Sequence, residues 1–409
     1  MDRLTPISSV TDLPSWVDTL GEGDLFLPDI LASLATHVGT PKSSADEPVI
    51  PHYLQTMGAQ SDRLWRQRLE LTTQKLHLEG IRRAVVVMVD GMGAEAVSVY
   101  RAYLPFLRSH ENEFVSAKTI IPSTTASAIT AFTTGGLPAA TRMVGWAVAD
   151  GDKTTDLLSF SNASVSPEDR QQVPTLFQRA RSLGVSSAVV NARKFAASGL
   201  TRAALRGAQY VGADSLVERV NRAVNTSVGG VDLVYLYWHG LDHAGHGHGP
   251  GSQEWLNALE EVDAGLKLLC SQLPADTAVI LTADHGMVSS LPDTRIDIAS
   301  QPHLTTGVKL LAGEGRCIHL HTQTPDDQEV LDRWCESLAD RAWMVPRTDL
   351  TQVWGPGPGN EDVGAALVFL NDHWTVGDSR TQRTTTLALP GVHGSLTESE
   401  RSIVAARLK

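Results

Sequence analysis

Cysteine is scarce in this 409-residue chain, in which only Cys270, Cys317 and Cys335 occur. An odd number of cysteines without metal-type spacing excludes a disulfide framework and a cysteine-ligated metal site, so we interpret them as buried free thiols. No apolar run approaches the roughly 18–20 residues that span a bilayer, and the first residues lack an apolar stretch of signal-peptide length. These absences predict a cytoplasmic protein without a membrane partner.

Positive charge is also in deficit. The chain has 34 Lys and Arg residues against 46 Asp and Glu residues, a formal net charge of −12. Binding to duplex nucleic acid needs a basic face, and this composition argues against it. An anionic small molecule remains a suitable partner, because bound divalent cations reverse the local potential inside an acidic protein. The composition leaves the oligomeric state open.

Apolar runs alternate with helix-like stretches over most of the chain. Continuous apolar runs are typical of strands that are buried on both faces of a parallel sheet. The expected strands are 84–89, 114–121, 185–190, 231–237 and 279–282, and the expected helices are 94–107, 125–133, 175–182, 215–224 and 255–273. This order predicts an α/β fold with a mostly parallel central sheet and helices on both faces.

Two stretches depart from this alternation. Residues 1–60 are weakly periodic and are interpreted as an N-terminal extension with one short helix within 25–34. Over 291–380 the pattern weakens, with one helix expected at 326–339 and a short strand at 365–370. We therefore expect 61–290 and 381–409 to form the core, and 291–380 to form a small inserted cap subdomain.

Aspartate and histidine residues follow several of the expected strands. The candidates are Asp90, Asp242, His246, Asp284, His285 and His393. A single aspartate after a strand is often only a helix cap, but the carboxyl ends of parallel strands meet at one edge of a sheet, so we expect these side chains to converge. Six such ligands suit two divalent metals with three ligands each, which leaves an open coordination position for catalysis.

A hydroxyl-rich stretch, Ser123-Thr124-Thr125, follows Pro122 where a strand is expected to end and a helix to begin. An ordinary helix N-cap is one interpretation of these hydroxyls. Near two divalent metals, the same position predicts a nucleophile for attack on phosphorus, because metals lower the pKa of a hydroxyl and the helix start offers N–H groups to an anion. The residues by themselves leave the choice among the three hydroxyls open.

These motifs together resemble the type I phosphodiesterase/nucleotide pyrophosphatase family of the alkaline phosphatase superfamily. The resemblance covers roughly residues 80–400 and runs through Val-Asp90-Gly, Pro-Ser-Thr-Thr125, Asp242-x-x-x-His246-x-x-Gly-Pro, Asp284-His285-Gly-Met and His393-Gly. It implies an alkaline-phosphatase-like fold and a hydrolase with two zinc ions and a phosphothreonine intermediate. Manganese or iron would also suit such ligands.

The resemblance also implies a role for each residue. Thr125 is the implied nucleophile, because the nucleophile of the family stands third after the proline. One zinc is implied to be held by Asp90, Asp284 and His285 beside Thr125. The other zinc is implied to be held by Asp242, His246 and His393, and the sequence allows Asp90 to lean towards either metal.

Two positions depart from the family pattern. Trp146 stands where many members have an asparagine that helps to bind a phosphoryl oxygen, and Thr141-Arg142 replaces a His-Gly pair. Arg142 is interpreted either as a positive substrate contact or as a solvated surface residue. Trp146 would stack on a base or block a wider substrate. His239 and His243 are expected at the pocket wall.

The resulting hypothesis is a hydrolase of small, nucleotide-like phosphodiesters or pyrophosphates. A phosphonate hydrolase, a phosphomonoesterase and a mutase of the same superfamily are alternatives that would use the same metals. A catalytically silent metal-binding protein is the alternative from another class. The basic stretch 191–206 fits either a substrate contact or a solvated face.

Overall fold

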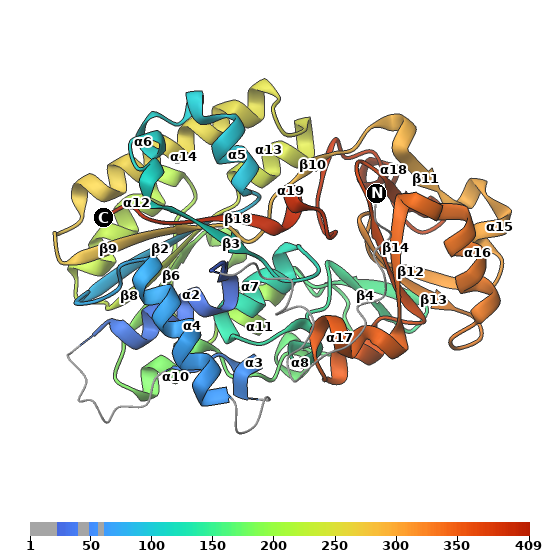
Figure 1. Cartoon of the computed structure of the whole chain (residues 1–409), viewed down its shortest axis with the longest axis horizontal. Helices are drawn as coiled ribbons and strands as arrows, with labels where there is room; N and C mark the ends of the chain where they lie inside the picture. Colours follow the sequence, from blue (N-terminus) through green and yellow to red (C-terminus); the bar gives the residue numbers. More distant parts are fainter. Residues whose placement is uncertain (1–22, 40–48, 56–60) are drawn as a thin grey trace.

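The computed structural model describes residues 23–39, 49–55 and 61–409. An eight-stranded sheet in the order β1-β3-β18-β9-β2-β8-β6-β7 forms its centre (Figure 1). All of these strands run parallel except β18, which is antiparallel to both of its neighbours. Their bounds are β1 Leu25–Phe26, β2 Arg83–Val89, β3 Phe114–Lys118, β6 Ser187–Asn191, β7 Gln209–Gly212, β8 Leu233–Trp238, β9 Thr277–Thr282 and β18 Ser402–Arg407.

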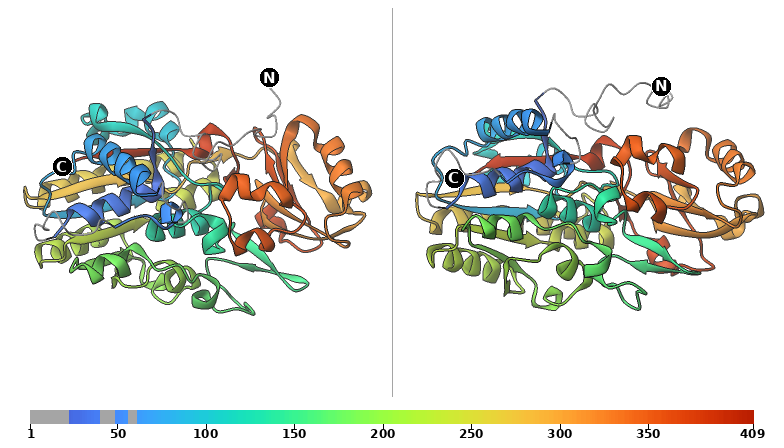
Figure 2. Two further views of the ribbon diagram at one scale, coloured as in Figure 1. Left: turned by 60° about the horizontal axis from the view of Figure 1, so that its bottom comes forward. Right: turned by 90° about the horizontal axis from the view of Figure 1, so that it is seen from below.

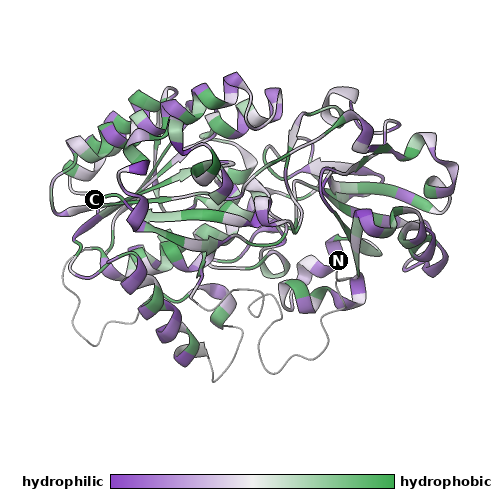
Figure 3. Cartoon of the chain, turned by 45° about the horizontal axis from the view of Figure 1, so that its top comes forward, coloured by the Kyte–Doolittle hydropathy of each residue, from purple (hydrophilic) through white to green (hydrophobic). Residues whose placement is uncertain are grey.

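The three central strands β9, β2 and β8 carry almost unbroken apolar runs because helices cover them on both faces. Val86 in β2 is fully buried and lies opposite Ile280 of β9 and Tyr235 of β8. Figure 3 shows hydrophobic residues concentrated in these strands and hydrophilic residues on the outer sides of the helices. The predicted α/β fold with a mostly parallel sheet is confirmed.

Helices pack on both faces of the sheet (Figure 1). One layer contains α5 Ala94–Val99, α6 Pro105–Arg108, α12 Leu216–Val228, α13 Gly240–His248 and α14 Gln253–Gln272. The other layer contains α2 Leu27–His37, α4 Ser61–Lys75, α7 Thr125–Thr134, α10 Leu176–Ser182 and α11 Gly199–Ala204. Among the described residues, no helix is both long and apolar enough to cross a lipid bilayer.

The single helix expected over 94–107 is wrong. The chain forms α5, a short 3-10 turn and then α6, which has Pro105 in its first turn. Proline has no N–H to donate and fits only the start of a helix, so the helix is restarted here. The backbone N–H groups of Phe106 and Leu107 donate to the Asp263 carboxylate of α14, at 2.9 and 2.8 Å, which ties α6 to the longer helix.

The described part of residues 1–60 is packed into the core. The short helix expected within 25–34 is present as α2, and β1 adds a strand to the edge of the sheet beside β3. Asp29 of α2 is fully buried, accepts a hydrogen bond from the Tyr53 hydroxyl at 2.7 Å and pairs with Arg68 at 2.7 Å. The rest of the predicted extension lies outside the described residues.

A second, four-stranded antiparallel sheet lies beyond the carboxyl ends of the parallel strands (Figures 1 and 2). Its order is β12-β13-β15-β14, with bounds β12 Val308–Glu314, β13 Cys317–Thr322, β14 Ala342–Pro346 and β15 Ala366–Leu370. Helix α16, Gln328–Leu338, packs on it and contributes the fully buried Trp334 to a separate hydrophobic cluster. We call this sheet with α16 the subdomain. The boundaries 291 and 380 stay a prediction.

Candidate active site

The predicted metal ligands come from separate elements that end at the same edge of the central sheet. Asp90 directly follows β2, and the Asp284–His285 pair follows β9. Helix α13 begins two residues after β8 and carries Asp242 and His246 one turn apart on one face. His393 follows the short strand β17, Gly391–Val392. The parallel topology therefore brings together residues that are up to about 300 positions apart in the sequence.

Three of these residues form the Asp90 group, which consists of Asp90, Asp284 and His285. Their ligand atoms all lie within 4.8 Å of one another. His285 Nε2 is 3.2 Å from Asp90 Oδ1 and 3.6 Å from Asp284 Oδ2. All three residues are buried. The structure thus gathers the ligand set that the family resemblance implies for one metal.

The other three residues form the Asp242 group, which consists of Asp242, His246 and His393. Asp242 Oδ1 lies 3.4 Å from His246 Nε2 and 3.8 Å from His393 Nε2. The two histidine Nε2 atoms are 3.2 Å apart. The imidazole rings of His393 and His285 stack with centroids 3.6 Å apart, so the two groups lie next to each other.

Backbone carbonyls orient every histidine of the two groups. The Nδ1 atom of His246 is 2.8 Å from the Gly391 carbonyl oxygen, and that of His393 is 3.0 Å from the Ser123 carbonyl oxygen. His285 Nδ1 is 3.0 Å from the Gly286 carbonyl oxygen. A carbonyl accepts only from a protonated nitrogen, so in a neutral ring Nε2 keeps its lone pair and can bind a metal, as in metal-ligating histidines.

In the part of the chain that the structure describes, one carboxylate oxygen of each aspartate in the two groups is buried without a hydrogen bond: Asp90 Oδ1, Asp242 Oδ1 and Asp284 Oδ2. The opposite oxygens of two of them are occupied. Asp90 Oδ2 accepts from the Tyr237 hydroxyl, and Asp284 Oδ1 accepts from the backbone N–H groups of Gly91 and His285. Buried carboxylate oxygens are normally paired or coordinate a metal, so these atoms fit two divalent cations.

The electrostatics of the site also favour the binding of cations. Burial, reinforced by the negative charge of Asp90, raises the pKa of Asp242 and of Asp284 well above the usual range. Burial by itself would lower the pKa of His285, but Asp284 and Asp90 raise it to about 10. The protein therefore gathers more negative charge here than its own side chains neutralise.

Of the three candidate hydroxyls, only that of Thr125 is next to a metal-ligand group. Thr125 is the first residue of α7, and its Oγ1 lies 3.1 Å from His285 Nε2. The Ser123 hydroxyl donates to the Ser395 carbonyl at 2.8 Å, and the Thr124 hydroxyl donates to Glu314 at 2.9 Å. Those two hydroxyls are bonded to other partners, so the Thr125 hydroxyl is the one that lies beside the Asp90 group.

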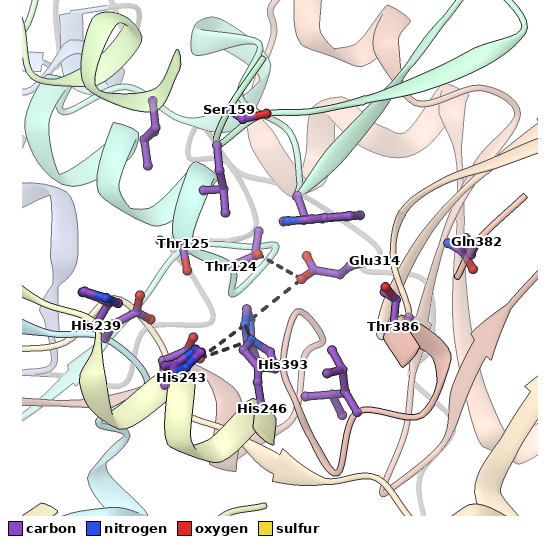
Figure 4. Close-up of a pocket in the computed structure, with 18 of the residues that line it drawn as sticks. Thr124, Thr125, Ser159, His239, His243, His246, Glu314, Gln382, Thr386 and His393 are labelled. Carbon is purple, nitrogen blue, oxygen red and sulfur yellow. Dashed lines mark hydrogen bonds and ion pairs between the residues drawn. The ribbon is translucent and has the colours of Figure 1, made fainter. Parts of the chain in front are cut away.

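A cavity of about 1080 Å³ opens over both groups. Figure 4 shows His246 and His393 close together on one side of it, with Thr125 nearby on another. Trp146 lines the cavity with 37% of its surface exposed. His239 and His243 also lie in the wall, and Lys194 is the residue of the basic stretch 191–206 whose charge faces the cavity. The cavity is large enough for a nucleotide-sized ligand.

Arg142 forms an ion pair and keeps about one third of its side chain exposed. It does not line the cavity; its guanidinium binds both carboxylate oxygens of Asp362, at 2.9 and 2.5 Å. Arg170 approaches the same carboxylate at 3.6 Å. Asp362 belongs to the 3-10 helix Pro358–Asp362, so Arg142 ties the catalytic core to the segment that follows β14.

Glu314, the last residue of β12, lies outside the predicted site residues and lines the cavity from the side of the subdomain. Its burial raises the pKa of the carboxyl to about 8. No motif of the family contains this residue. The segment Gly313-Glu314-Gly315-Arg316 is a charged turn between two apolar strands, and such a turn could have indicated a functional residue. The elements that Glu314 contacts are distant in the sequence, so the turn alone does not place it in the site.

Solved structures with a similar fold cover most of the chain. Murine ectonucleotide pyrophosphatase/phosphodiesterase 5, solved as an inactive variant in complex with AMP, superposes with a TM-score of 0.65 and 16% identity over 79% of this chain and 87% of that one. Phosphonoacetate hydrolase from Sinorhizobium meliloti 1021 in complex with phosphonoformate superposes with a TM-score of 0.62 and 17% identity over 81% and 91%. The chain therefore shares the fold of these two proteins.

The profile of the type I phosphodiesterase/nucleotide pyrophosphatase family matches residues 84–396, and the chain belongs to this family. The description of this family names phosphodiesterases and nucleotide pyrophosphatases.

Curated relatives match only short stretches. The catalytic subunit of human GPI ethanolamine phosphate transferase 3 is 34% identical over 59 residues, which are 14% of this chain and 5% of that protein. GPI ethanolamine phosphate transferase 1 of Emericella nidulans is 44% identical over 62 residues, 7% of its length.

Proposed function

We propose that this protein hydrolyses phosphodiester or nucleotide pyrophosphate bonds with Thr125 as the nucleophile. The observation that carries the proposal is the position of the Thr125 hydroxyl, 3.1 Å from His285 and at the start of a helix, beside two adjacent groups of unsatisfied metal ligands. Family membership supports the reaction class, and the large cavity favours a substrate with two groups on phosphorus over a small monoester.

We infer that the Asp90 group and the Asp242 group would each hold one divalent cation. Zinc suits ligand sets of two carboxylates with one imidazole and of one carboxylate with two imidazoles, and manganese or iron are alternatives. When bound, such cations would neutralise charge on the phosphoryl oxygens and make the nearby hydroxyl and water more acidic.

The residues of the chain would perform the reaction in two displacements. Thr125 Oγ1 loses its proton and forms a bond to phosphorus while the bond between phosphorus and the leaving oxygen breaks. The leaving oxygen takes up a proton, and the leaving group departs as an alcohol or a phosphate. Backbone N–H groups at the start of α7 face the phosphoryl group and favour its negative charge. A water molecule then forms a bond to phosphorus, the bond to Thr125 breaks, and the hydroxyl is restored.

Substitution T125A tests the proposal. We expect kcat on bis-p-nitrophenyl phosphate to fall at least about 1000-fold, as it does when a nucleophile is lost. Substitution S123A is the matched control, because it removes a neighbouring hydroxyl that bonds to Ser395 instead. A T125A protein that keeps more than about a tenth of wild-type turnover would overturn the assignment of Thr125.

A further inference from the structure

Glu314 brings a carboxyl group from the subdomain to the immediate neighbourhood of the nucleophile. Its Oε2 accepts a hydrogen bond from the Thr124 hydroxyl at 2.9 Å and lies 3.8 Å from His393 Nδ1 (Figure 4). Thr124 directly precedes the proposed nucleophile. The carboxyl group therefore borders the space in which the phosphoryl group and its substituents would lie.

The other oxygen of Glu314, Oε1, is buried. No group within residues 23–39, 49–55 and 61–409 donates a hydrogen bond to it. His393 Nδ1 is directed to the Ser123 carbonyl, and Glu314 belongs to neither group of metal ligands. A buried carboxyl oxygen without a hydrogen-bond donor destabilises the folded protein. A ligand that donates a hydrogen bond to this oxygen would remove that cost.

The surrounding backbone fixes the Glu314 side chain in place. A Cβ atom at Gly394 would lie 2.7 Å from the Glu314 carboxyl carbon, so the chain passes directly over it. Arg316, two residues further along the turn, is fully buried and binds both oxygens of Glu400 at 3.0 and 2.6 Å. It also donates to the carbonyls of the 371–374 loop. A carboxyl held this rigidly is suited to recognition.

The nearby cations of the chain do not reach Oε1. Arg295 lines the same cavity, but its guanidinium donates to Ser290 and to the Leu389 carbonyl. Lys194 lies over the ring of Phe195, with its Nζ 4.8 Å from the ring centroid. A donor group on a ligand in this cavity would fill the position beside Oε1. Trp146 offers an exposed indole to the same cavity, and an aromatic face together with a carboxylate suits an ammonium group.

We propose that Glu314 is a specificity-determining residue that binds a protonated amine on the non-leaving ester group of the substrate. The substrate class is then an aminoalkyl phosphodiester, in which the ammonium group lies close to phosphorus. An ammonium beside Oε1 supplies the missing donor and stabilises the buried negative charge. This inference rests on the proposed function, and it deepens that function by naming the substrate class.

Three matched chromogenic esters test it: the p-nitrophenyl phosphodiesters of ethanol, ethylene glycol and ethanolamine. They differ only in a terminal hydrogen, hydroxyl or ammonium group. We expect wild-type kcat/KM to be at least about tenfold higher for the aminoethyl ester than for the ethyl ester, with the hydroxyethyl ester between them. In E314Q and E314A the ratio of aminoethyl to ethyl should fall below about threefold.

Substitution D297N is the matched control. Asp297 also lines the cavity, but its Oδ1 accepts from the backbone N–H groups of Ala299 and Ser379, so the preference for the aminoethyl ester should persist. The metal content of each variant is measured as well, because a loss of metal in E314Q would make Glu314 a ligand and overturn the inference.

The outcomes separate the inference from the function on which it rests. If the wild type hydrolyses all three esters without preference, or if E314Q and E314A keep the wild-type ratio, the role of Glu314 is overturned while the hydrolase function stands. If the wild type hydrolyses none of the three esters, the proposed function fails and this inference fails with it.

Discussion

The two walls of the cavity differ in how their residues are distributed along the sequence. The wall at the edge of the central sheet is built around Asp90, Asp284 and His285, each within three residues of a strand end. The opposite wall comes from the subdomain, where Glu314 ends β12 in an antiparallel sheet. The first wall is made of short motifs and the second of long-range packing. The proposed nucleophile and metal ligands therefore depend on local motifs, and the proposed specificity residue depends on contacts between distant segments.

Removal of metal should have the largest effect, and it tests the wall at the sheet edge. Because three aspartates share one buried site, we expect chelation to lower kcat/KM at least about 1000-fold and zinc to restore it. Metal analysis should find two ions per chain. Full activity in a chain that metal analysis shows to be metal-free would contradict the assignment of this wall to catalysis.

Substitution H246A should come next, because it breaks only the Asp242 group. We expect the metal content to fall from two ions per chain towards one and kcat/KM to fall about 100-fold. Metal analysis and steady-state kinetics on the same preparation check this.

Substitution H248A is the matched control. His248 lies on the same helix, but its side chain is half exposed and faces Glu254 at 3.9 Å. Equal loss of metal in both variants would show that α13 had been disturbed rather than one ligand removed.

Substitution R316M tests how the opposite wall is held. Arg316 and Glu400 are both fully buried, so removal of the arginine leaves an unpaired buried carboxylate. We expect the free energy of unfolding to fall by about 3–5 kcal/mol, which denaturant titration measures. The double variant R316M/E400L should recover much of this loss. No loss in R316M would show that the pair does not hold the turn.

Substitution R142A should have the smallest effect. Its ion pair with Asp362 is partly exposed, so we expect a loss of stability of about 0.5–1 kcal/mol and kcat/KM on bis-p-nitrophenyl phosphate unchanged. A raised KM in R142A would restore Arg142 as a substrate contact.

Substitution W146A, in contrast, should raise KM for this aromatic diester several-fold, which corresponds to a loss of about 1 kcal/mol of binding free energy.

Much of the core was predictable because its patterns are local. Residues 84–89 form an apolar run long enough for one buried strand, and β2 Arg83–Val89 confirms it. The prediction of one helix over 94–107 is wrong because Pro105 must stand at the start of a helix, although the apolar periodicity continues on both sides of it. The choice of Thr125 came from resemblance, and the hydrogen bonds of Ser123 and Thr124 supply a physical reason for it.

The opposite wall was not predictable in this way. Arg142 was considered as a substrate contact, but its partner Asp362 lies 220 residues further along the chain. Glu314 has no flanking motif. Only the folded structure shows that no described group donates a hydrogen bond to its Oε1 atom. Such facts depend on which distant elements pack together, and no window of the sequence contains them.

By itself the sequence determined the class of fold, because apolar runs of strand and helix length are local consequences of burial. It also determined which residue types stand at the strand ends, and so the chemistry available there. Only the tertiary structure decided which hydroxyl faces the metal ligands, which arginine is already paired and which carboxyl enters the cavity. The physical reason is that a side chain's role depends on the partners left free to it, and these are set by contacts between distant parts of the chain.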